Sequence, residues 1–208
     1  MFNLKIKDFK IIVTILLAII FWYLTFSVQL LNFWLSMSIA ATTLSFLAIN
    51  WGGNPFKRED FNIRTIMIGT VSAIILYGVF LIGNFLSQLL FDFAKPQVSS
   101  IYNIRTQAEA IYITLVLLFI TSPGEEIFWR NYLQRWSMQK FGQFKGWIIA
   151  SLIYAGVHIS SGNFMLVMAA LIAGLFWGYI YWKENNTLAV TISHALWTTG
   201  IFVFLPVI

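Results

Sequence analysis

The sequence predicts an all-α fold: a polytopic bundle of about seven transmembrane helices, or about eight on an alternative count, with its N-terminus in the cytoplasm. Two features of the composition predict this class. Hydrophobic residues make up 59% of the 208 residues and charged residues only 10%, whereas soluble domains carry about 25% charged residues. Aromatic residues alone make up 18%, which suits a lipid-facing surface and its interfacial belts. A water-soluble domain is therefore excluded.

Several apolar runs approach the length of about 20 residues that a bilayer-crossing helix needs. In chain order they are residues 11–28, 32–49, 65–91, 108–139, 146–159, 164–182 and 187–205. Pro123 and Gly124 interrupt the fourth run, and the fifth run is short. We expect residues 54–64 to form a cytoplasmic loop and residues 96–105 an external loop. Because no repeat or second domain is visible, residues 1–208 are expected to form a single membrane domain.

The first run follows three lysines and resembles a secretory signal at first sight. Its apolar stretch is longer than the 7–15 residues typical of such a signal, and no clear small-residue cleavage site follows it. We therefore expect an uncleaved first span.

Basic residues predict the orientation of the spans, because Lys and Arg accumulate in cytoplasmic loops. With the N-terminus inside, the basic residues on the cytoplasmic side are Lys5, Lys7, Lys10, Lys57, Arg58, Arg64, Arg135, Lys140, Lys145 and Lys183. Only Lys95 and Arg105 fall outside. This asymmetry also accounts for the net charge of +5. Since no basic run is interleaved with aromatic residues, we expect no nucleic-acid partner.

Cysteine is absent and only two histidines are present. Disulfides, thiolate-held metals and a cysteine nucleophile are therefore excluded. Any metal site is limited to two imidazoles completed by carboxylates or water.

Ionisable residues inside a span cost about 2.5–3.5 kcal/mol each on insertion scales and mark functional sites by default. In this chain they are Glu125, Glu126, Arg130, His158 and His194. At about 1.5 Å per residue, Glu126, His158 and His194 lie roughly 16–21 Å from the cytoplasmic ends of their helices. Three separate helices therefore place carboxylate and imidazole groups at a similar depth, where they can converge in one cavity.

Spacing along the fourth span places Glu126 and Arg130 on one helix face, so that the guanidinium reduces the cost of burying the carboxylate. Glu125 points about 100° away. Two adjacent carboxylates repel, which favours a shared proton and a role in general acid–base chemistry. Three alternatives to a catalytic site remain. Glu126 and Arg130 can form a purely structural ion pair, the histidines can form hydrogen bonds between helices, and the whole set can serve proton-coupled transport. Ala170, Gly174 and Gly178 follow a small-xxx-small spacing, which we interpret as helix packing.

Three motifs occur in a fixed order inside these spans. Their sequences are GEEIFWRNYLQRW, which contains Glu125, Glu126 and Arg130; YAGVH, which runs from Tyr154 to His158; and SHALWTT, which contains His194 and Thr198. In this order and spacing they resemble the motifs of the CPBP family, the CAAX-protease and bacteriocin-processing membrane proteins also called Abi. The resemblance covers a core of about residues 108–205. Two positions depart from the family pattern, with Tyr154 in place of the usual Phe and Thr198 in place of the usual Asn or Asp.

The resemblance implies an intramembrane endopeptidase that cleaves a small hydrophobic or lipidated peptide or protein. It further implies that Glu125 or Glu126, together with His158, activates a water molecule. His194, with Thr198, would stabilise the oxyanion that develops on the peptide carbonyl.

Within the same scheme, Arg130 would set the charge state and orientation of the carboxylate. The family has been described both as metalloproteases and as metal-independent glutamate enzymes. We favour the metalloprotease description here and keep the metal-independent mechanism as the alternative. If a metal such as Zn²⁺ is present, Glu126, His158 and His194 would hold it, with an open position for water.

Other classes of membrane protease fit poorly, because the chain has no His-Glu-x-x-His zinc helix, no mid-span pair of aspartates and no Gly-x-Ser-Gly. The segment HISSGN that begins at His158 is instead expected to form a turn between two spans.

Two other functions compete with the peptidase. One is a non-proteolytic bacteriocin-immunity or membrane scaffold protein of the same fold, and the other is a proton-coupled carrier. Expected partners are a hydrophobic or lipidated peptide and membrane lipid, and the expected location is a bacterial cytoplasmic membrane. The sequence leaves the substrate's identity and the oligomeric state open.

Overall fold

The computed structural model describes residues 6–207, and all of the regular structure in that range is helical. The α-helices are α1 (Ile6–Tyr23), α2 (Phe33–Gly52), α3 (Ile63–Leu90), α4 (Ala94–Asn103), α5 (Ala110–Val116), α6 (Ser122–Glu126), α7 (Arg135–Phe141), α8 (Gln143–Val157), α9 (Phe164–Glu184) and α10 (Thr187–Thr199). Four π-helical turns extend or join them, at Leu24–Val28, Leu117–Thr121, Ile127–Gln134 and Gly200–Phe204. Short 3₁₀ turns lie at Arg58–Asp60, Ile104–Gln107 and His158–Ser161.

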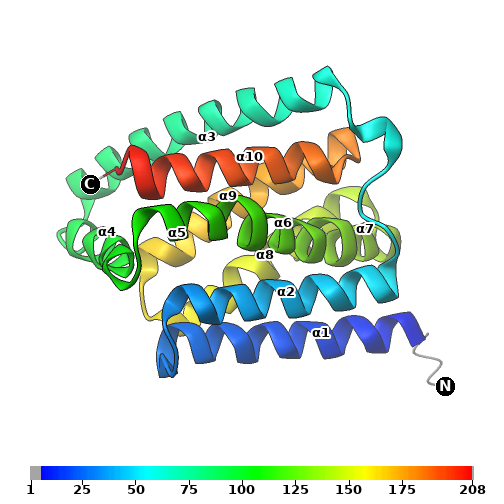
Figure 1. Ribbon diagram of the computed structural model, residues 1–208, viewed down its shortest axis with the longest axis horizontal. Coiled ribbons are helices and arrows are strands. Elements are labelled where there is room, and N and C mark those ends of the chain that lie inside the picture. Colours follow the sequence, from blue (N-terminus) through cyan, green and yellow to red (C-terminus); the bar gives the residue numbers. More distant parts are fainter. Residues whose placement is uncertain (1–5, 208) are drawn as a thin grey trace.

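The long helices lie side by side in a bundle (Figure 1). α3 and α10 pack together along one edge, and α1 and α2 pack together along the opposite edge. Between them, α5, α6 and α7 form one continuous rod, and α8 packs against α9. α4 lies at the end of the bundle where α10 ends, whereas α1 begins at the other end.

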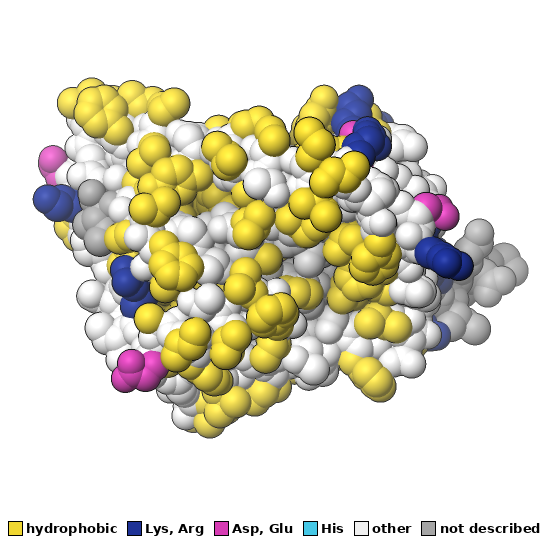
Figure 2. Space-filling model, turned by 45° about the horizontal axis from the view of Figure 1, so that its top comes forward, with side chains coloured by type: hydrophobic (Ala, Val, Ile, Leu, Met, Phe, Trp, Pro, Cys, Tyr) yellow, Lys and Arg dark blue, Asp and Glu magenta, His cyan; other side chains and the backbone are white. Residues whose placement is uncertain are grey.

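The predicted all-helical membrane bundle is confirmed. Six helical stretches in the described part of the chain are long and apolar enough to cross a membrane: Lys7–Val28, Phe33–Gly52, Ile63–Leu90, Ala110–Phe141, Phe164–Glu184 and Thr187–Phe204. The predicted fifth span corresponds to α8, whose 15 residues reach about 22 Å, less than the roughly 30 Å of a hydrocarbon core. Apolar side chains spread over the middle of the face drawn in Figure 2, and charged side chains lie toward its ends.

The fourth span is continuous from Ala110 to Phe141, so Pro123 does not interrupt it. Pro123 lies in the first turn of α6, directly after the π-helical turn Leu117–Thr121. A proline is tolerated at such a position, because the wider turn before it accommodates the missing N–H and the ring. Gly124 is needed for a different reason: a Cβ atom there would lie 2.9 Å from the carbonyl oxygen of Ala41. α2 and α6 are therefore in close contact directly beside the two glutamates.

The segment 96–105, which we predicted to be an external loop, is helical instead. It belongs to α4 and to the 3₁₀ turn Ile104–Gln107. Pro96 lies in the first turn of α4, where a proline fits, and Val98 and Ile101 face the cavity described below. Since α4 has only ten residues, its apolar face never forms the long run that identifies a span, which is why the sequence pattern missed it. By contrast, the predicted turn after α8 is confirmed, because Gly162 takes a left-handed conformation there with φ +63°.

The small residues of α9 act in packing, as predicted. A Cβ atom on Gly174 would lie 3.0 Å from Cδ1 of Tyr154, and one on Gly178 would lie 2.7 Å from Cδ1 of Trp147. The amide of Gln134 also donates a 2.7 Å hydrogen bond to the carbonyl oxygen of Gly178. These glycines therefore bring α8 and the fourth span close to α9.

Candidate active site

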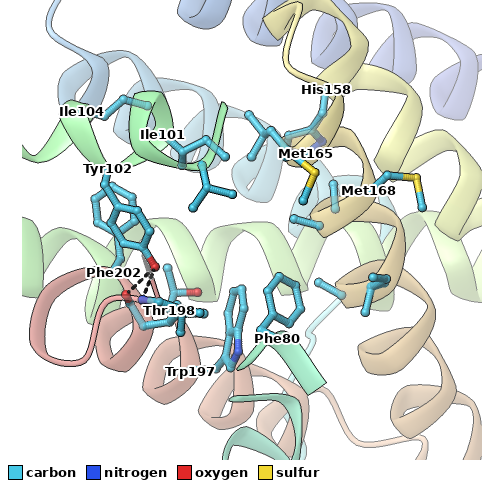
Figure 3. A pocket seen from close by; sticks show the side chains of 18 of the residues that line it. Phe80, Ile101, Tyr102, Ile104, His158, Met165, Met168, Trp197, Thr198 and Phe202 are labelled. Atoms are coloured by element: carbon cyan, nitrogen blue, oxygen red, sulfur yellow. Dashed lines mark hydrogen bonds between the residues drawn. The ribbon is translucent and has the colours of Figure 1, made fainter. Parts of the chain in front are cut away.

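One large cavity, with a volume of about 540 Å³, brings together most of the predicted site residues. Its walls are mainly apolar and come from α3, α4 and α9 (Figure 3), as well as from the π-helical turn after α1 and the first turns of α2. The ionisable side chains of the wall come from three other elements, with Glu125 on α6, His158 after α8 and His194 on α10. Tyr154 and Thr198 complete this polar end of the cavity. Carboxylate and imidazole groups from three helical segments therefore share one cavity, with Glu125 in the place that the depth argument gave to Glu126.

Glu126 lies behind the cavity wall rather than in it. Its side chain is fully buried, and its Oε1 atom lies 2.7 Å from Nδ1 of His194. Its Oε2 atom lies 3.3 Å from Nε of Arg130, which confirms the predicted ion pair on one face of the helix. The guanidinium of Arg130 lies between the rings of Tyr154 and Trp177, 4.7 and 5.5 Å from their centroids. Glu126 thus links a buried cation to an imidazole that faces the cavity.

Glu125 has a different environment from its neighbour. Its carboxylate lines the cavity, and the hydroxyl of Tyr154 donates a 3.1 Å hydrogen bond to its Oε2 atom. The two adjacent glutamates therefore point to different surroundings, Glu125 into the cavity and Glu126 behind its wall, as their angular separation on a helix predicts. Glu125 is the carboxylate that a substrate or water in the cavity can contact.

His158 is held by two neutral partners. Its Nδ1 atom lies 2.8 Å from the carbonyl oxygen of Tyr154. A carbonyl oxygen only accepts hydrogen bonds, so Nδ1 carries the proton, and Nε2 is the acceptor. The indole N–H of Trp22 donates to that Nε2 atom over 3.1 Å. Both ring nitrogens of His158 are therefore occupied.

Thr198 lies one helical turn after His194 and faces the same cavity (Figure 3). Its hydroxyl oxygen is buried and has no hydrogen-bond partner among the described residues. A buried polar atom without a partner costs roughly 1–3 kcal/mol. Its position next to His194 makes this hydroxyl available to a ligand in the cavity.

The residues proposed to hold a metal do not fit one in this arrangement. Glu126 contacts His194 and Arg130 with its two oxygens, and Trp22 occupies Nε2 of His158. Within residues 6–207, no group of three or more His, Asp or Glu side chains is close enough to hold a metal ion. The chemistry below is therefore assigned to the side chains alone.

Sequence reasoning missed two tryptophans of the site. Trp22, on α1, is fully buried and binds His158, while Trp177, on α9, stacks on the ring of His194 with 3.9 Å between centroids. Trp177 lies three residues after Gly174 in the small-residue stretch of α9. That stretch indicated a helix in close contact with its neighbours, but no signal in the sequence pointed to Trp22.

Part of the chain matches a known protein family. Residues 107–200 match the family described as type II CAAX prenyl endopeptidase, Rce1-like. The match covers all three motifs and confirms the predicted resemblance to the CAAX protease family. No curated protein and no solved structure matches the chain significantly.

Proposed function

Since residues 107–200 match the Rce1-like family of CAAX proteases, we propose that this multi-pass membrane protein cleaves a small hydrophobic or lipidated peptide by attack of an activated water. The observation that carries the proposal is the shape of the cavity: apolar walls that end at Glu125, His158 and His194. Such a cavity suits a ligand that is apolar over most of its length and presents one polar bond to the ionisable groups.

Glu125 is the proposed general base. It is the glutamate that lines the cavity, and the hydroxyl of Tyr154 orients its carboxylate. In the proposed reaction, Glu125 takes a proton from water as the water oxygen attacks the peptide carbonyl. The same carboxyl group then returns the proton to the leaving amine, so that the base is regenerated when the C–N bond breaks.

His194 and Thr198 are the proposed donors to the oxyanion that forms on the carbonyl oxygen. Glu126 fixes the ring of His194 through Nδ1, which leaves Nε2 as the nitrogen for the substrate. A carboxylate behind an imidazole holds its orientation and stabilises its charged form. Arg130 balances the charge of Glu126 in the same buried group, and His158 supports Tyr154 from the side. Preorganised donors of this kind contribute about 10²–10³ in rate.

A glutamate-type reaction without a resident metal is the catalytic type that this donor geometry supports. Zinc is the metal to test, because two histidines and a carboxylate are ligands that it accepts. Metal content measured on the purified protein, before and after treatment with a chelator, checks this choice. Equal cleavage with and without the chelator is the expected result.

The proposal is tested with purified protein in lipid vesicles and two fluorogenic peptides, one farnesylated and one unmodified but hydrophobic. Glu125→Gln and His194→Ala are each expected to lower the cleavage rate by about 10²-fold or more. Glu109→Gln is the matched control, because Glu109 is exposed and outside the cavity. Cleavage at the unaltered rate by both site variants would leave a non-proteolytic immunity or scaffold protein as the function.

A further inference from the structure

The cavity lies toward one end of the bundle. Each long helix that borders the cavity contributes only one part of its length to the wall. These parts are residues 33–37 of α2, 79–87 of α3 with Phe91 after it, 117–125 of the fourth span, 164–177 of α9, and 194–202 of α10 and the π-helical turn that follows it. On α2, α3, α9 and α10 these parts include the end that lies toward α4, and on the fourth span they follow α5. α4 itself contributes Val98, Ile101 and Tyr102 to the wall.

On the other side, the cavity is closed by tightly packed side chains. Leu76, Val190 and Tyr181 form one buried cluster with Trp177, and each is at most 3% exposed. Next to them, Glu126 and Arg130 are 0% and 2% exposed. A ligand therefore has no open path from the cavity into this part of the bundle.

The cavity reaches the surface at the α4 end. Phe91, after α3, and Phe164, at the start of α9, both line the cavity, and they are 44% and 50% exposed. Phe93 packs edge-to-face on Phe164 with 5.9 Å between the ring centroids. The corner formed by α3, α4 and α9 is therefore the exposed edge of the cavity.

Basic residues are concentrated at the opposite end. Contacts between helix ends tie several of them together there: Lys7 with Gln139, Lys140 with Asp8, Arg135 with the carbonyl of Gly52, and Arg64 with Glu184. Lys10, Lys57, Arg58, Lys145 and Lys183 belong to the same helix ends and their connecting segments. At the α4 end the basic residues are Lys95 and Arg105. No lysine or arginine is among the described residues that line the cavity.

We propose that substrate enters the cavity from the non-cytoplasmic side of the membrane. Lys and Arg are retained on the cytoplasmic side, so the end rich in basic residues faces the cytoplasm. The α4 end, with the mouth of the cavity, then faces outward. The active site is reached through the outer half of the bilayer.

This orientation restricts the substrate, in a step that rests on the proposed function. The bond to be cleaved must already be in the outer half of the membrane when it meets Glu125. The substrate is therefore an exported or membrane-inserted peptide. A translocation step precedes cleavage, and the released product leaves on the non-cytoplasmic side.

Because the chain contains no cysteine, single cysteines can test the orientation without any assay of activity. Ser87→Cys reports on the cavity wall, since Ser87 lines it and is half-buried. Thr106→Cys reports on the exposed surface next to α4, and Asn54→Cys on the exposed segment at the basic end. Each variant is treated in intact cells with a membrane-impermeant maleimide, then again after permeabilisation, and once more in detergent to show that its thiol reacts.

We expect Thr106→Cys and Ser87→Cys to be labelled in intact cells to the same fraction as in permeabilised cells. Asn54→Cys is expected to be labelled only after permeabilisation. The reverse pattern, with only Asn54→Cys labelled in intact cells, overturns the proposal. Labelling of Thr106→Cys without labelling of Ser87→Cys, even in permeabilised cells, also overturns it, because the cavity would then not be open to water from that side. None of these outcomes depends on whether the protein is a peptidase.

Discussion

The two histidines of this chain line the same cavity but have opposite kinds of partner. His194 is held at Nδ1 by the carboxylate of Glu126 and stacks on Trp177. His158 is held at Nδ1 by a carbonyl oxygen and at Nε2 by the indole of Trp22. His194 thus has a charged partner on one nitrogen, whereas His158 has neutral partners on both.

This difference suggests different roles for the two histidines, although the sequence motifs do not distinguish them. An imidazole backed by a carboxylate is held in one orientation, and in its doubly protonated form it donates from Nε2 to a developing oxyanion. An imidazole between a carbonyl and an indole is held as one neutral tautomer. We therefore assign chemistry to His194 and positioning to His158, and the predictions below test that assignment.

The largest expected effect comes from removing the charge behind His194. Glu126→Gln leaves the guanidinium of Arg130 buried without its carboxylate, and breaking a buried pair in this way costs about 3–5 kcal/mol of stability. Thermal unfolding of the protein in detergent measures the loss. The double variant Glu126→Gln with Arg130→Met is expected to recover much of it, because neither charge is then left alone. A single variant as stable as the unaltered protein would contradict the buried pair.

The second prediction compares the histidines directly. His194→Ala is expected to lower kcat by about 10²–10³-fold, which is typical for loss of an oxyanion donor. His158→Ala is expected to lower it by only about 10-fold, since it removes support for Tyr154 and no reacting group. Cleavage of the same peptide by both variants, at saturating substrate, gives the comparison. Equal losses would mean that both histidines take part in the chemistry.

The sequence predicted which residues form the site but not the different roles of the two histidines. Depth along a helix follows from a fixed rise per residue, so the shared level of Glu126, His158 and His194 was predictable. Which carboxylate meets which imidazole depends on how each helix is rotated in the bundle. The π-helical turns Leu117–Thr121 and Ile127–Gln134 flank the two glutamates, and such turns alter that rotation.

Contacts between segments that are distant in the chain could not be predicted from the sequence either. Trp22 is 136 positions from His158 in the chain, and an apolar run shows that a helix spans the membrane without showing which helices it contacts. The same reason applies to α4, because its short apolar face forms part of the cavity wall only when α4 packs against α3 and α9. Motif residues and the ion pair within one helix were thus predicted, whereas partners on other helices were not.

The third prediction concerns the indole that holds His158. Trp22→Phe keeps an aromatic ring but removes the N–H group, so Nε2 loses its donor. We expect a loss of about 0.5–1.5 kcal/mol in stability. Nitrogen NMR of ¹⁵N-histidine-labelled protein should also show a changed Nε2 signal for one of the two histidines.

Trp129→Phe is the matched control for this change. Trp129 is 2% exposed, packs edge-to-face on Trp22, and its own N–H makes no hydrogen bond with the described residues. It should leave the tautomer of His158 unchanged. If the two variants shift the histidine signals alike, the hydrogen bond from Trp22 does not set the tautomer.

The smallest effect is expected from Thr198, whose hydroxyl is the second proposed donor to the oxyanion and lies one helical turn from His194. Thr198→Val is nearly the same size and removes only that hydroxyl. Because the hydroxyl has no partner among the described residues, its loss should leave the protein at least as stable. If it donates to the oxyanion, kcat should fall several-fold with KM little changed, since the interaction forms only in the transition state. Thr198→Asn restores a donor and should recover turnover. A fall in stability with unchanged kcat would instead assign Thr198 to packing, and the oxyanion would then depend on His194 alone.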